Sequence, residues 1–305
     1  IEGVPSPLKP KGWRTLLKQG DSWDQDALFL LAGILWGFKL IDPGADIGHY
    51  HCRNYKSIMG DTKATDFVDR LVHSETEMGR LTKVDKPPQH IHALGVVPKD
   101  GSSYRPITDC SRPEGESVNN FMTQTFSHFR YNSLDDVTDK LTEECYLAVT
   151  DLSNAYRSVP VRPVDREKMG ICWQKGDVSH YYRDNFLCFG TKVAPFIFSR
   201  LSDAVVRIMA GLGYSGVVNY LDDFLLVGPS REECLQAQLT LHRVLRELGF
   251  SIAFHKVRSP AQVSRYLGIE IDTVNFEYRL PTDKLQKLHQ AVSYTHLTLP
   301  TIQPV

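Results

Sequence analysis

The chain has 305 residues, of which 42% are hydrophobic and 23% are charged, and its formal net charge is −1. This composition is typical of a globular protein and argues against an intrinsically disordered one. Because the chain as a whole is almost neutral, any binding of nucleic acid would need a local groove lined with lysine and arginine. Six scattered cysteines without a Cys-x-x-Cys pair favour reduced thiols in an intracellular protein over a disulfide framework.

The first part of the chain is predicted to be largely helical. Residues 1–20 contain three prolines and four basic side chains, and we interpret them as a loosely ordered basic arm. Residues 27–38 are all apolar, but this run is shorter than the about 20 residues that a membrane span needs. We therefore predict a buried helix over 25–41 and expect no membrane partner. Helical spacing of apolar residues predicts a second helix over 62–83.

A hairpin that presents two cations is predicted next. Strand-like runs at 91–97 and 104–109 flank a turn centred on residues 100–101, which are Asp-Gly. Lys99 and Arg105 lie near the tip and the base of this hairpin. Cations in such a position suit a triphosphate, since arginine binds two phosphate oxygens at once. The alternative is that both are ordinary solvated surface cations.

An acid follows the next buried strand. A helix begun by Ser133 is predicted over 133–144, and an apolar strand over 145–151 ends in Asp151. Strand-like runs at 168–173 and 180–189 then form a further pair. An acid at the end of a core strand is poorly suited to packing and well suited to binding a metal ion.

The most informative stretch is residues 216–228, where short apolar runs flank Asp222 and Asp223. The pattern predicts a β-hairpin with the acids at its bend, where both side chains approach one point. Two crowded carboxylates repel each other unless a cation lies between them, and Mg²⁺ or Mn²⁺ is the natural occupant. Taken alone, a solvated Asp-Asp turn remains an equally simple interpretation.

Asp151 and the two hairpin acids are expected to come together in the fold. A helix that opens near Pro195 separates the strand ending at Asp151 from the hairpin that carries Asp222 and Asp223. Three carboxylates from two neighbouring strands are the arrangement that two-metal phosphoryl transfer requires. One ion would lower the pKa of a primer 3′-hydroxyl and the other would stabilise the leaving pyrophosphate.

The remaining chain is predicted to alternate between helix and strand. A capping box at Ser230 begins a helix that Gly249 ends, and a short strand over 250–254 leads to Lys256. A further strand over 266–271 is expected to pair with 276–280. Residues 293–305 continue no pattern and resemble translated sequencing-adapter DNA, so we exclude them from the fold prediction as a non-native tail.

Seven short blocks in this order resemble a retroelement reverse transcriptase, over roughly residues 85–285. The blocks cover residues 94–99, 105–109, 151–156, 189–195, 220–223, 249–256 and 266–268. The Tyr-Leu-Asp-Asp box at 220–223 is weak evidence alone, whereas seven blocks in order are specific. The residues within these blocks are most similar to those of DIRS-like tyrosine-recombinase retroelements, with gypsy-type elements as the second choice.

The resemblance implies a right-hand polymerase fold of the α+β class, with an antiparallel palm sheet packed on helices. After the arm at 1–20, helices and fingers would span 21–145 and the palm 146–275, with a fingers excursion at about 162–190. Residues 276–292 would begin the thumb or connection. The thumb is otherwise largely missing and no RNase H region is recognisable, so a firm grip on the template-primer is not expected of this fragment.

The resemblance also implies roles for individual residues in an RNA-directed DNA polymerase. Asp151, Asp222 and Asp223, with the Leu152 carbonyl, would hold two Mg²⁺ ions, with Mn²⁺ as a substitute. Tyr156 would exclude the 2′-hydroxyl of a ribonucleotide, although a packed core tyrosine is the simpler alternative. The remaining roles are a proton donor to pyrophosphate (Lys256, with a plain surface lysine as the alternative), triphosphate contacts (Lys99 and Arg105), the floor of the nucleotide pocket (Phe189 and Gly190) and support of the primer end (Tyr220, Tyr266, Leu267 and Gly268).

The partners implied are an RNA or DNA template with its primer, deoxynucleoside triphosphates, and the RNase H and recombinase or integrase regions of the same polyprotein. One departure from the family pattern is Asn154, which stands where many relatives have an aspartate. Two other functions compete with this one. An RNA-directed RNA polymerase shares the palm, but Tyr156 argues against it. A non-catalytic nucleic-acid-binding remnant is disfavoured because all three acids are intact.

Overall fold

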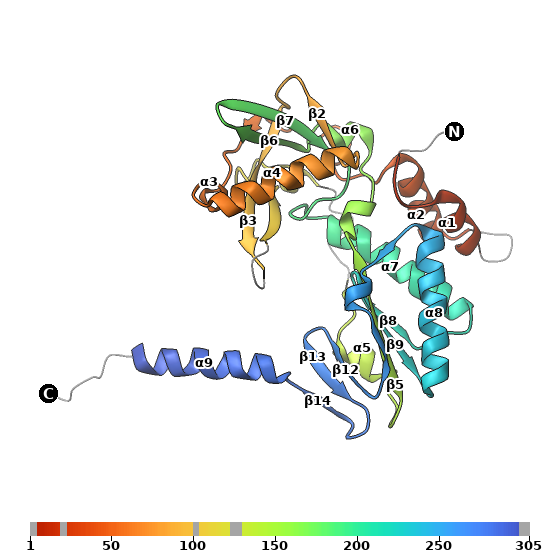
Figure 1. Ribbon diagram of the computed structural model, residues 1–305. Coiled ribbons are helices and arrows are strands. Elements are labelled where there is room, and N and C mark those ends of the chain that lie inside the picture. The colour runs from red at the N-terminus through yellow and green to blue at the C-terminus, as the bar shows by residue number, and fades with distance from the viewer. Residues whose placement is uncertain (1–4, 19–22, 100–103, 123–129, 299–305) are drawn as a thin grey trace.

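The computed structural model describes residues 5–18, 23–99, 104–122 and 130–298. Figure 1 shows two bodies, one above the other, with helix α9 (Thr282–Thr298) projecting from the lower one. The upper body is a sheet with helices α3 and α4 beside it, and the lower body is a second sheet covered by helices α7 and α8. Within the described ranges, every helix is too short or too polar to traverse a lipid bilayer.

The sheet of the lower body, which we call the central sheet, carries the predicted acids. Its strands run in the order β10-β5-β9-β8, and β11 also pairs with β5. Their bounds are β5 Tyr146–Ser153, β8 Val217–Tyr220, β9 Asp223–Gly228, β10 Ser251–Ile252 and β11 Arg258–Ala261. Every pairing in this sheet is antiparallel, as predicted for the palm.

Two long helices pack against the central sheet and bury its apolar side chains. Helix α7 (Ala194–Gly211) contacts β8, and helix α8 (Arg231–Leu248) contacts β5 and β9. The side chain of Ser230 accepts the N–H of Glu233, which caps the start of α8, and Gly249 ends it with a φ of 95°. Leu201, Leu241 and Phe224 are completely buried between the helices and the sheet. The predicted boundaries of α8 are confirmed.

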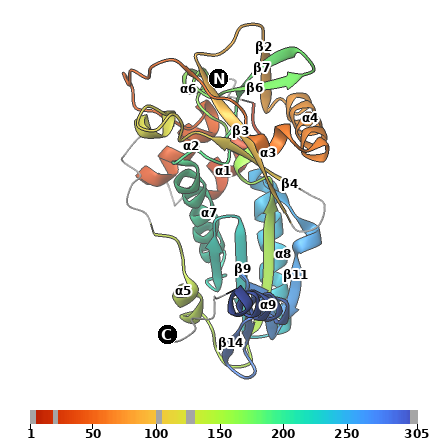
Figure 2. The same ribbon diagram turned by 90° about the vertical axis from the view of Figure 1, so that its left-hand side faces the viewer.

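The upper body is a six-stranded sheet that mixes parallel and antiparallel pairs. Its order is β1-β3-β6-β7-β2, and β4 pairs with β3. The strands are β1 Tyr50–His51, β2 Leu81–Val84, β3 His90–Pro98, β4 Tyr104–Asp109, β6 Gly170–Lys175 and β7 Val178–Asp184. Helices α3 (Lys56–Met59) and α4 (Thr62–Glu77) lie against it. In both views the β3–β4 hairpin extends toward the lower body (Figure 1 and Figure 2).

The N-terminal arm departs from its prediction, because residues 10–16 form a docked helix. Helix α1 (Pro10–Leu16) packs on α8, and Trp13 at its centre is completely buried. The indole N–H of Trp13 donates to the carbonyl oxygen of Leu248 at 3.0 Å. The basic composition led to the wrong prediction, because Lys11 and Arg14 face solvent while Leu8, Trp13 and Leu17 are buried in the core.

Three predicted helices are shorter in the structure. Helix α2 (Gln25–Trp36) ends at Gly37, whose φ of 85° breaks the helix predicted to reach residue 41. Helix α4 ends at Glu77, and Leu81, which was assigned to that helix, begins strand β2. The helix begun by Ser133 covers only α5 (Leu134–Thr138). Apolar spacing alone does not separate a helix from the strand that follows it.

The C-terminal part also differs in detail. The strand predicted over 266–271 is two strands, β12 (Val263–Tyr266) and β13 (Ile269–Asp272), joined by a tight turn. Strand β14 (Glu277–Arg279) pairs with β13, which confirms the pairing predicted for 276–280. The backbone of α9 continues through residues 293–298, which the sequence pattern had left out of the fold.

Candidate active site

The centre of the predicted hairpin is a two-residue turn of the central sheet. Tyr220 at the end of β8 pairs with Asp223 at the start of β9, so Leu221 and Asp222 form the turn. Leu221 has a φ of 52°, which lies in the left-handed region that branched side chains rarely adopt. Strain of this kind persists where the surrounding structure enforces it. The turn interrupts the alternation that would send adjacent carboxylates to opposite faces.

Asp151 lies directly opposite this turn. In the register of β5 and β9, Asp151 is the cross-strand partner of Asp223. Opposed residues of an antiparallel pair project from the same face of the sheet. The main chain holds the third acid nearby, since the N–H of Leu152 donates to the carbonyl oxygen of Asp222 at 3.0 Å. The structure therefore brings Asp151, Asp222 and Asp223, the carboxylate triad, to one end of the β5–β9 pair.

The carboxylate triad is short of hydrogen-bond donors and of positive charge. Asp151 is only 8% exposed, and its Oδ1 atom is buried without a hydrogen-bond partner. Burial and a hydrogen bond with Asp151 raise the pKa of Asp223 to about 7. Burial also raises the pKa of Asp222, and the charge of Asp151 adds to this effect. Such a cluster resists full ionisation until a cation lies among its oxygens.

Lys256 provides one positive charge at the edge of the triad. It ends the short helix η4 (Phe254–Lys256), and its Nζ lies 2.8 Å from Oδ2 of Asp151. This hydrogen bond raises the pKa of the ammonium group. A cavity of about 400 Å³ opens beside the ion pair, and its walls include Asp223 and Tyr266. The Lys256 side chain is 47% exposed, and its ammonium group contacts the triad directly.

The predicted nucleotide pocket lies beyond β5. Tyr156 follows that strand in helix η3 (Tyr156–Ser158), and its ring lies 4.9 Å from the ring of Phe189 and 5.6 Å from that of Phe198. Tyr156 is 9% exposed, whereas Phe189 is 49% exposed and faces outward. Gly190 has a φ of 121°, and a Cβ atom there would collide with the carbonyl oxygen of Thr108. Glycine at 190 therefore permits a backbone contact that other residues would prevent.

The two cations predicted to bind the triphosphate belong to the β3–β4 hairpin. Arg105 on β4 pairs with Val97 and is exposed, and its charge lowers the pKa of Asp222 in opposition to burial. Lys99 is exposed and directly follows β3. The Asp-Gly turn predicted at residues 100–101 lies outside the described residues. Arg105 therefore acts electrostatically on the carboxylate triad.

Three of the residues predicted to support the primer, Tyr266, Leu267 and Gly268, line the same cavity as Asp151 and Asp223. Tyr266 is 3% exposed and its hydroxyl donates to the carbonyl oxygen of Asp223 at 3.3 Å. Leu267 and Gly268 form the turn between β12 and β13 with φ values of 48° and 77°. The hydrogen bond of Tyr266 therefore connects the β12–β13 turn to the hairpin that carries Asp222 and Asp223.

One aromatic contact in this region escaped the sequence analysis. The rings of Tyr131 and Tyr220 lie 5.4 Å apart and are tilted by 34°. The side-chain amide of Asn132 donates to the main chain and the side chain of Asn219, at 3.0 and 2.8 Å, which fixes the segment before α5 against β8. No periodicity marked Tyr131, and its partner Tyr220 is distant in the sequence.

The triad has the chemistry of a divalent-metal site. Among the described residues, no group of three or more His, Cys, Asp or Glu side chains is already arranged around a common metal position. The unpartnered Oδ1 of Asp151 and the raised pKa of Asp223 nevertheless fit a set of oxygen ligands for a divalent cation. Binding an ion there would compete with the ammonium group of Lys256 for Asp151.

Comparison with known proteins identifies the family by sequence. The reverse transcriptase (RNA-dependent DNA polymerase) family matches residues 97–271, which is more than half of the chain. The Gag-Pro-Pol polyprotein of bovine leukemia virus is 27% identical over 210 residues, covering 64% of this chain and 15% of that protein. Protein P of duck hepatitis B virus is 28% identical over 123 residues, covering 40% of this chain and 15% of that protein. The chain thus spans about 15% of the length of these relatives.

Solved structures show the same fold. The foamy viral protease-reverse transcriptase in complex with double-stranded DNA matches with a TM-score of 0.66 and 17% identity, covering 94% of this chain and 50% of that one. The same protein in complex with an RNA/DNA hybrid matches with a TM-score of 0.67 and 16% identity, covering 95% and 38%. The predicted α+β right-hand polymerase fold is confirmed. From the matched region, this chain belongs to the reverse transcriptase (RNA-dependent DNA polymerase) family.

Proposed function

We propose that this chain is the polymerase part of a reverse transcriptase and adds deoxynucleotides to the 3′-hydroxyl of a primer. The observation that carries this function is the pairing of Asp151 with Asp223 across β5 and β9, with Asp222 in the adjoining turn. Family membership supports the same reaction class. The double-stranded DNA and RNA/DNA hybrid in the foamy viral structures support a template-primer as the partner.

Asp151, Asp222 and Asp223, with the carbonyl oxygen of Leu152, are the groups that would hold two divalent metal ions, Mg²⁺ or Mn²⁺. When bound, such ions would supply Lewis-acid stabilisation of the attacking oxygen and of the phosphates. The raised pKa of Asp223, about 7, supports this assignment, because burial and the neighbouring carboxylates disfavour a further negative charge there. Lys256, on the Asp151 side, is suited to deliver a proton to the leaving pyrophosphate.

The incoming nucleotide would lie between the β3–β4 hairpin and the triad. Lys99 and Arg105 would bind its phosphates, with Arg105 able to form two parallel hydrogen bonds. Phe189 and Gly190 would form the pocket floor. The ring of Tyr156, buried against Phe189, would leave no room for a 2′-hydroxyl, which supports deoxynucleotides as substrates.

The primer end would lie against Tyr266, Leu267 and Gly268, with Tyr220 beneath it, because this turn reaches the strand of Asp223 through the Tyr266 hydroxyl. In this assignment the N-terminal helices and fingers span residues 21–145, and the palm is 146–275 with a fingers excursion at about 162–190. Residues 276–292 begin the thumb or connection. Helix α1, within the predicted basic arm at 1–20, becomes part of the palm's outer layer because it packs on α8.

The context of the chain follows from its relatives. The name of one relative, the Gag-Pro-Pol polyprotein, supports origin within a longer retroelement or viral protein, where RNase H and a recombinase or integrase would accompany this chain. An intracellular location fits this role. A DIRS-like element remains our first assignment for the subfamily, and a gypsy-type element the second.

Primer extension tests the proposal. Purified protein should extend a DNA primer on an RNA template with deoxynucleotides and Mg²⁺. Asp222→Asn should reduce the rate on the order of 10³-fold, because several kcal/mol of metal-assisted stabilisation are lost at 1.36 kcal/mol per tenfold. Binding of the template-primer should be retained.

Asp177→Asn is the matched control, since Asp177 is an exposed acid in the β6–β7 turn of the upper body. It should extend at the wild-type rate. If the wild type binds the template-primer but no divalent ion promotes extension, the chain is a non-catalytic binding module and the proposal is wrong.

A further inference from the structure

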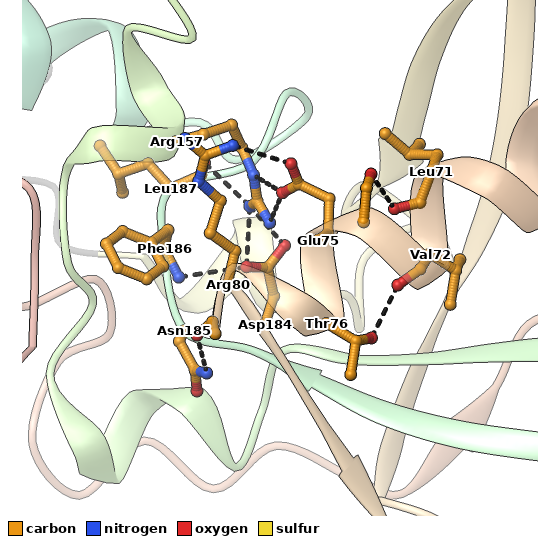
Figure 3. A network of polar contacts seen from close by, with 12 residues as sticks. Leu71, Val72, Glu75, Thr76, Arg80, Arg157, Asp184, Asn185, Phe186 and Leu187 are labelled. Atoms are coloured by element: carbon orange, nitrogen blue, oxygen red, sulfur yellow. Dashed lines mark hydrogen bonds and ion pairs between the residues drawn. The ribbon is translucent and has the colours of Figure 1, made fainter. Parts of the chain in front are cut away.

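A fully paired arginine lies directly behind the nucleotide pocket. The side chain of Arg157 is only 13% exposed, and it bonds two carboxylates from different parts of the chain (Figure 3). Its Nη2 and Nε lie 2.6 and 2.7 Å from Oε2 of Glu75. Its Nη1 lies 2.7 Å from both carboxylate oxygens of Asp184 and 3.3 Å from the carbonyl oxygen of Leu187.

These contacts balance the buried charges. Burial acts against the charge of Arg157, yet the carboxylates of Asp184 and Glu75 raise its pKa above the ordinary value. Glu75 also accepts a hydrogen bond from Nη1 of Arg80 at 2.9 Å, so two guanidinium groups face two carboxylates. A buried ion-pair network of this kind often stabilises no more than apolar packing would. We therefore look for the role of this network in the positions that it imposes on the surrounding segments.

The network connects three segments that meet at the pocket. Glu75 belongs to α4 of the upper body, and Asp184 ends β7. Arg157 itself directly follows Tyr156, the residue assigned to sugar selection. Asp184 Oδ1 also accepts the N–H of Phe186 at 3.1 Å, which orients the segment leading to the pocket floor.

Main-chain hydrogen bonds hold the same two segments together. The N–H of Leu187 donates to the carbonyl oxygen of Val159 at 3.0 Å, and the N–H of Val161 donates to that of Asn185 at 2.9 Å. The segment after β5 and the segment after β7 are thus held side by side. Tyr156 lies on the first and Phe189 on the second, and their ring centroids are 4.9 Å apart.

We propose that Arg157 is a positioning residue for sugar selection: through Glu75 and Asp184 it holds Tyr156 in register with Phe189 and couples that pair to helix α4. Arg157 itself touches no substrate in this role. The inference rests on the proposed function, because it assigns Tyr156 and Phe189 to the deoxynucleotide site. The proposal requires that one planar guanidinium group donate hydrogen bonds to both carboxylates, those of Glu75 and Asp184.

The test compares Arg157→Lys and Glu75→Gln with the wild type. Lysine keeps the charge but cannot bond both carboxylates with parallel hydrogen bonds, and glutamine keeps the shape but removes one charge. In primer extension, each variant should discriminate between deoxy- and ribonucleotides about tenfold less well, since small displacements near a reacting group cost up to about 10²-fold. The KM for deoxynucleotides should rise more than kcat falls.

A second measurement does not depend on catalysis. Nucleotide affinity is measured with Ca²⁺ on a primer that ends in a dideoxynucleotide, as the ratio of ribo- to deoxynucleotide dissociation constants. The same loss of discrimination should appear in this ratio. If no protein extends a primer but the affinity ratio still shifts, the proposed polymerase activity fails while the positioning role stands.

Asp165→Asn is the matched control for stability. Asp165 is 1% exposed, lies 2.9 Å from Nη2 of the partly exposed Arg162 and accepts the N–H of Leu40 at 2.8 Å, so it is a buried, ion-paired acid outside the pocket. It should lower the melting temperature and leave sugar discrimination unchanged. If Arg157→Lys and Glu75→Gln also leave both ratios unchanged, or if Asp165→Asn shifts them equally, the positioning role is overturned.

Discussion

Asp151 and Asp223 occupy directly opposed positions on β5 and β9, and the pKa of Asp223 is raised to about 7 by burial and by its hydrogen bond with Asp151. The folded protein therefore binds a proton that an unfolded chain, with an aspartate pKa near about 3.9, releases. Between these two values the folded state holds more protons, so its stability must fall as the pH rises.

We accordingly predict that the metal-free protein is less stable at pH 8 than at pH 5.5. The contribution of Asp223 should be about 1 kcal/mol, because solvent screens this partly exposed pair. Thermal unfolding in EDTA across this range measures it, and Asp223→Asn should show a flatter profile than the wild type. Mg²⁺ should restore stability at pH 8 more than at pH 5.5. A wild-type profile in the Asn variant would show that the carboxyl pair does not share a proton.

Lys256 should affect both metal binding and chemistry. Without its ammonium group, Asp151 has no competing cation, so Lys256→Met should bind Mn²⁺ more tightly than the wild type in the absence of nucleotide. Loss of a proton donor should slow single-turnover extension by about 10²-fold or more. Electron paramagnetic resonance measures the first effect and rapid quench the second.

Lys256→Arg is the control for charge, because it keeps a cation beside Asp151 but its guanidinium does not release a proton. This variant should retain wild-type Mn²⁺ affinity, and its single-turnover extension should still be slow. Fast extension by the Met variant would leave the lysine without a role in proton transfer.

Tyr156 should determine which sugar is accepted. Tyr156→Ala should lower discrimination against ribonucleotides on the order of 10²-fold, because the ring that occupies the 2′ position is removed. Tyr156→Phe keeps the ring and should discriminate like the wild type. Competition between the two nucleotides in primer extension measures the ratio. Unchanged selectivity in the Ala variant would make Tyr156 a core residue packed on Phe189 and Phe198.

Helix α1 should stabilise the lower body without taking part in catalysis. Trp13→Ala removes a completely buried ring and its hydrogen bond to Leu248, and it should destabilise the protein by about 3–5 kcal/mol. Trp13→Phe should cost less, and Arg14→Ala, at an exposed position of the same helix, should cost little. Urea denaturation gives these differences. Equal stability of all three variants would mean that α1 is not docked in solution.

Much of this protein is determined by its sequence, because local patterns carry the information. The strand that carries Asp151, the hairpin around Asp222 and Asp223, and the helix begun by Ser230 each follow from apolar runs, turn residues and capping within a few positions. The order of the seven blocks was sufficient to name the family. The three acids were predicted to converge because each follows or interrupts a buried strand.

Only the tertiary structure decided the contacts made across long stretches of chain. Nothing near Trp13 in sequence reveals its partner Leu248, and nothing near Arg157 reveals Glu75 and Asp184. The left-handed turn at Leu267 and the contact of Lys256 with Asp151 likewise depend on strand register in the folded sheet. Periodicity records which face of an element is apolar, whereas the identity of the element that covers it is set by packing of the whole chain.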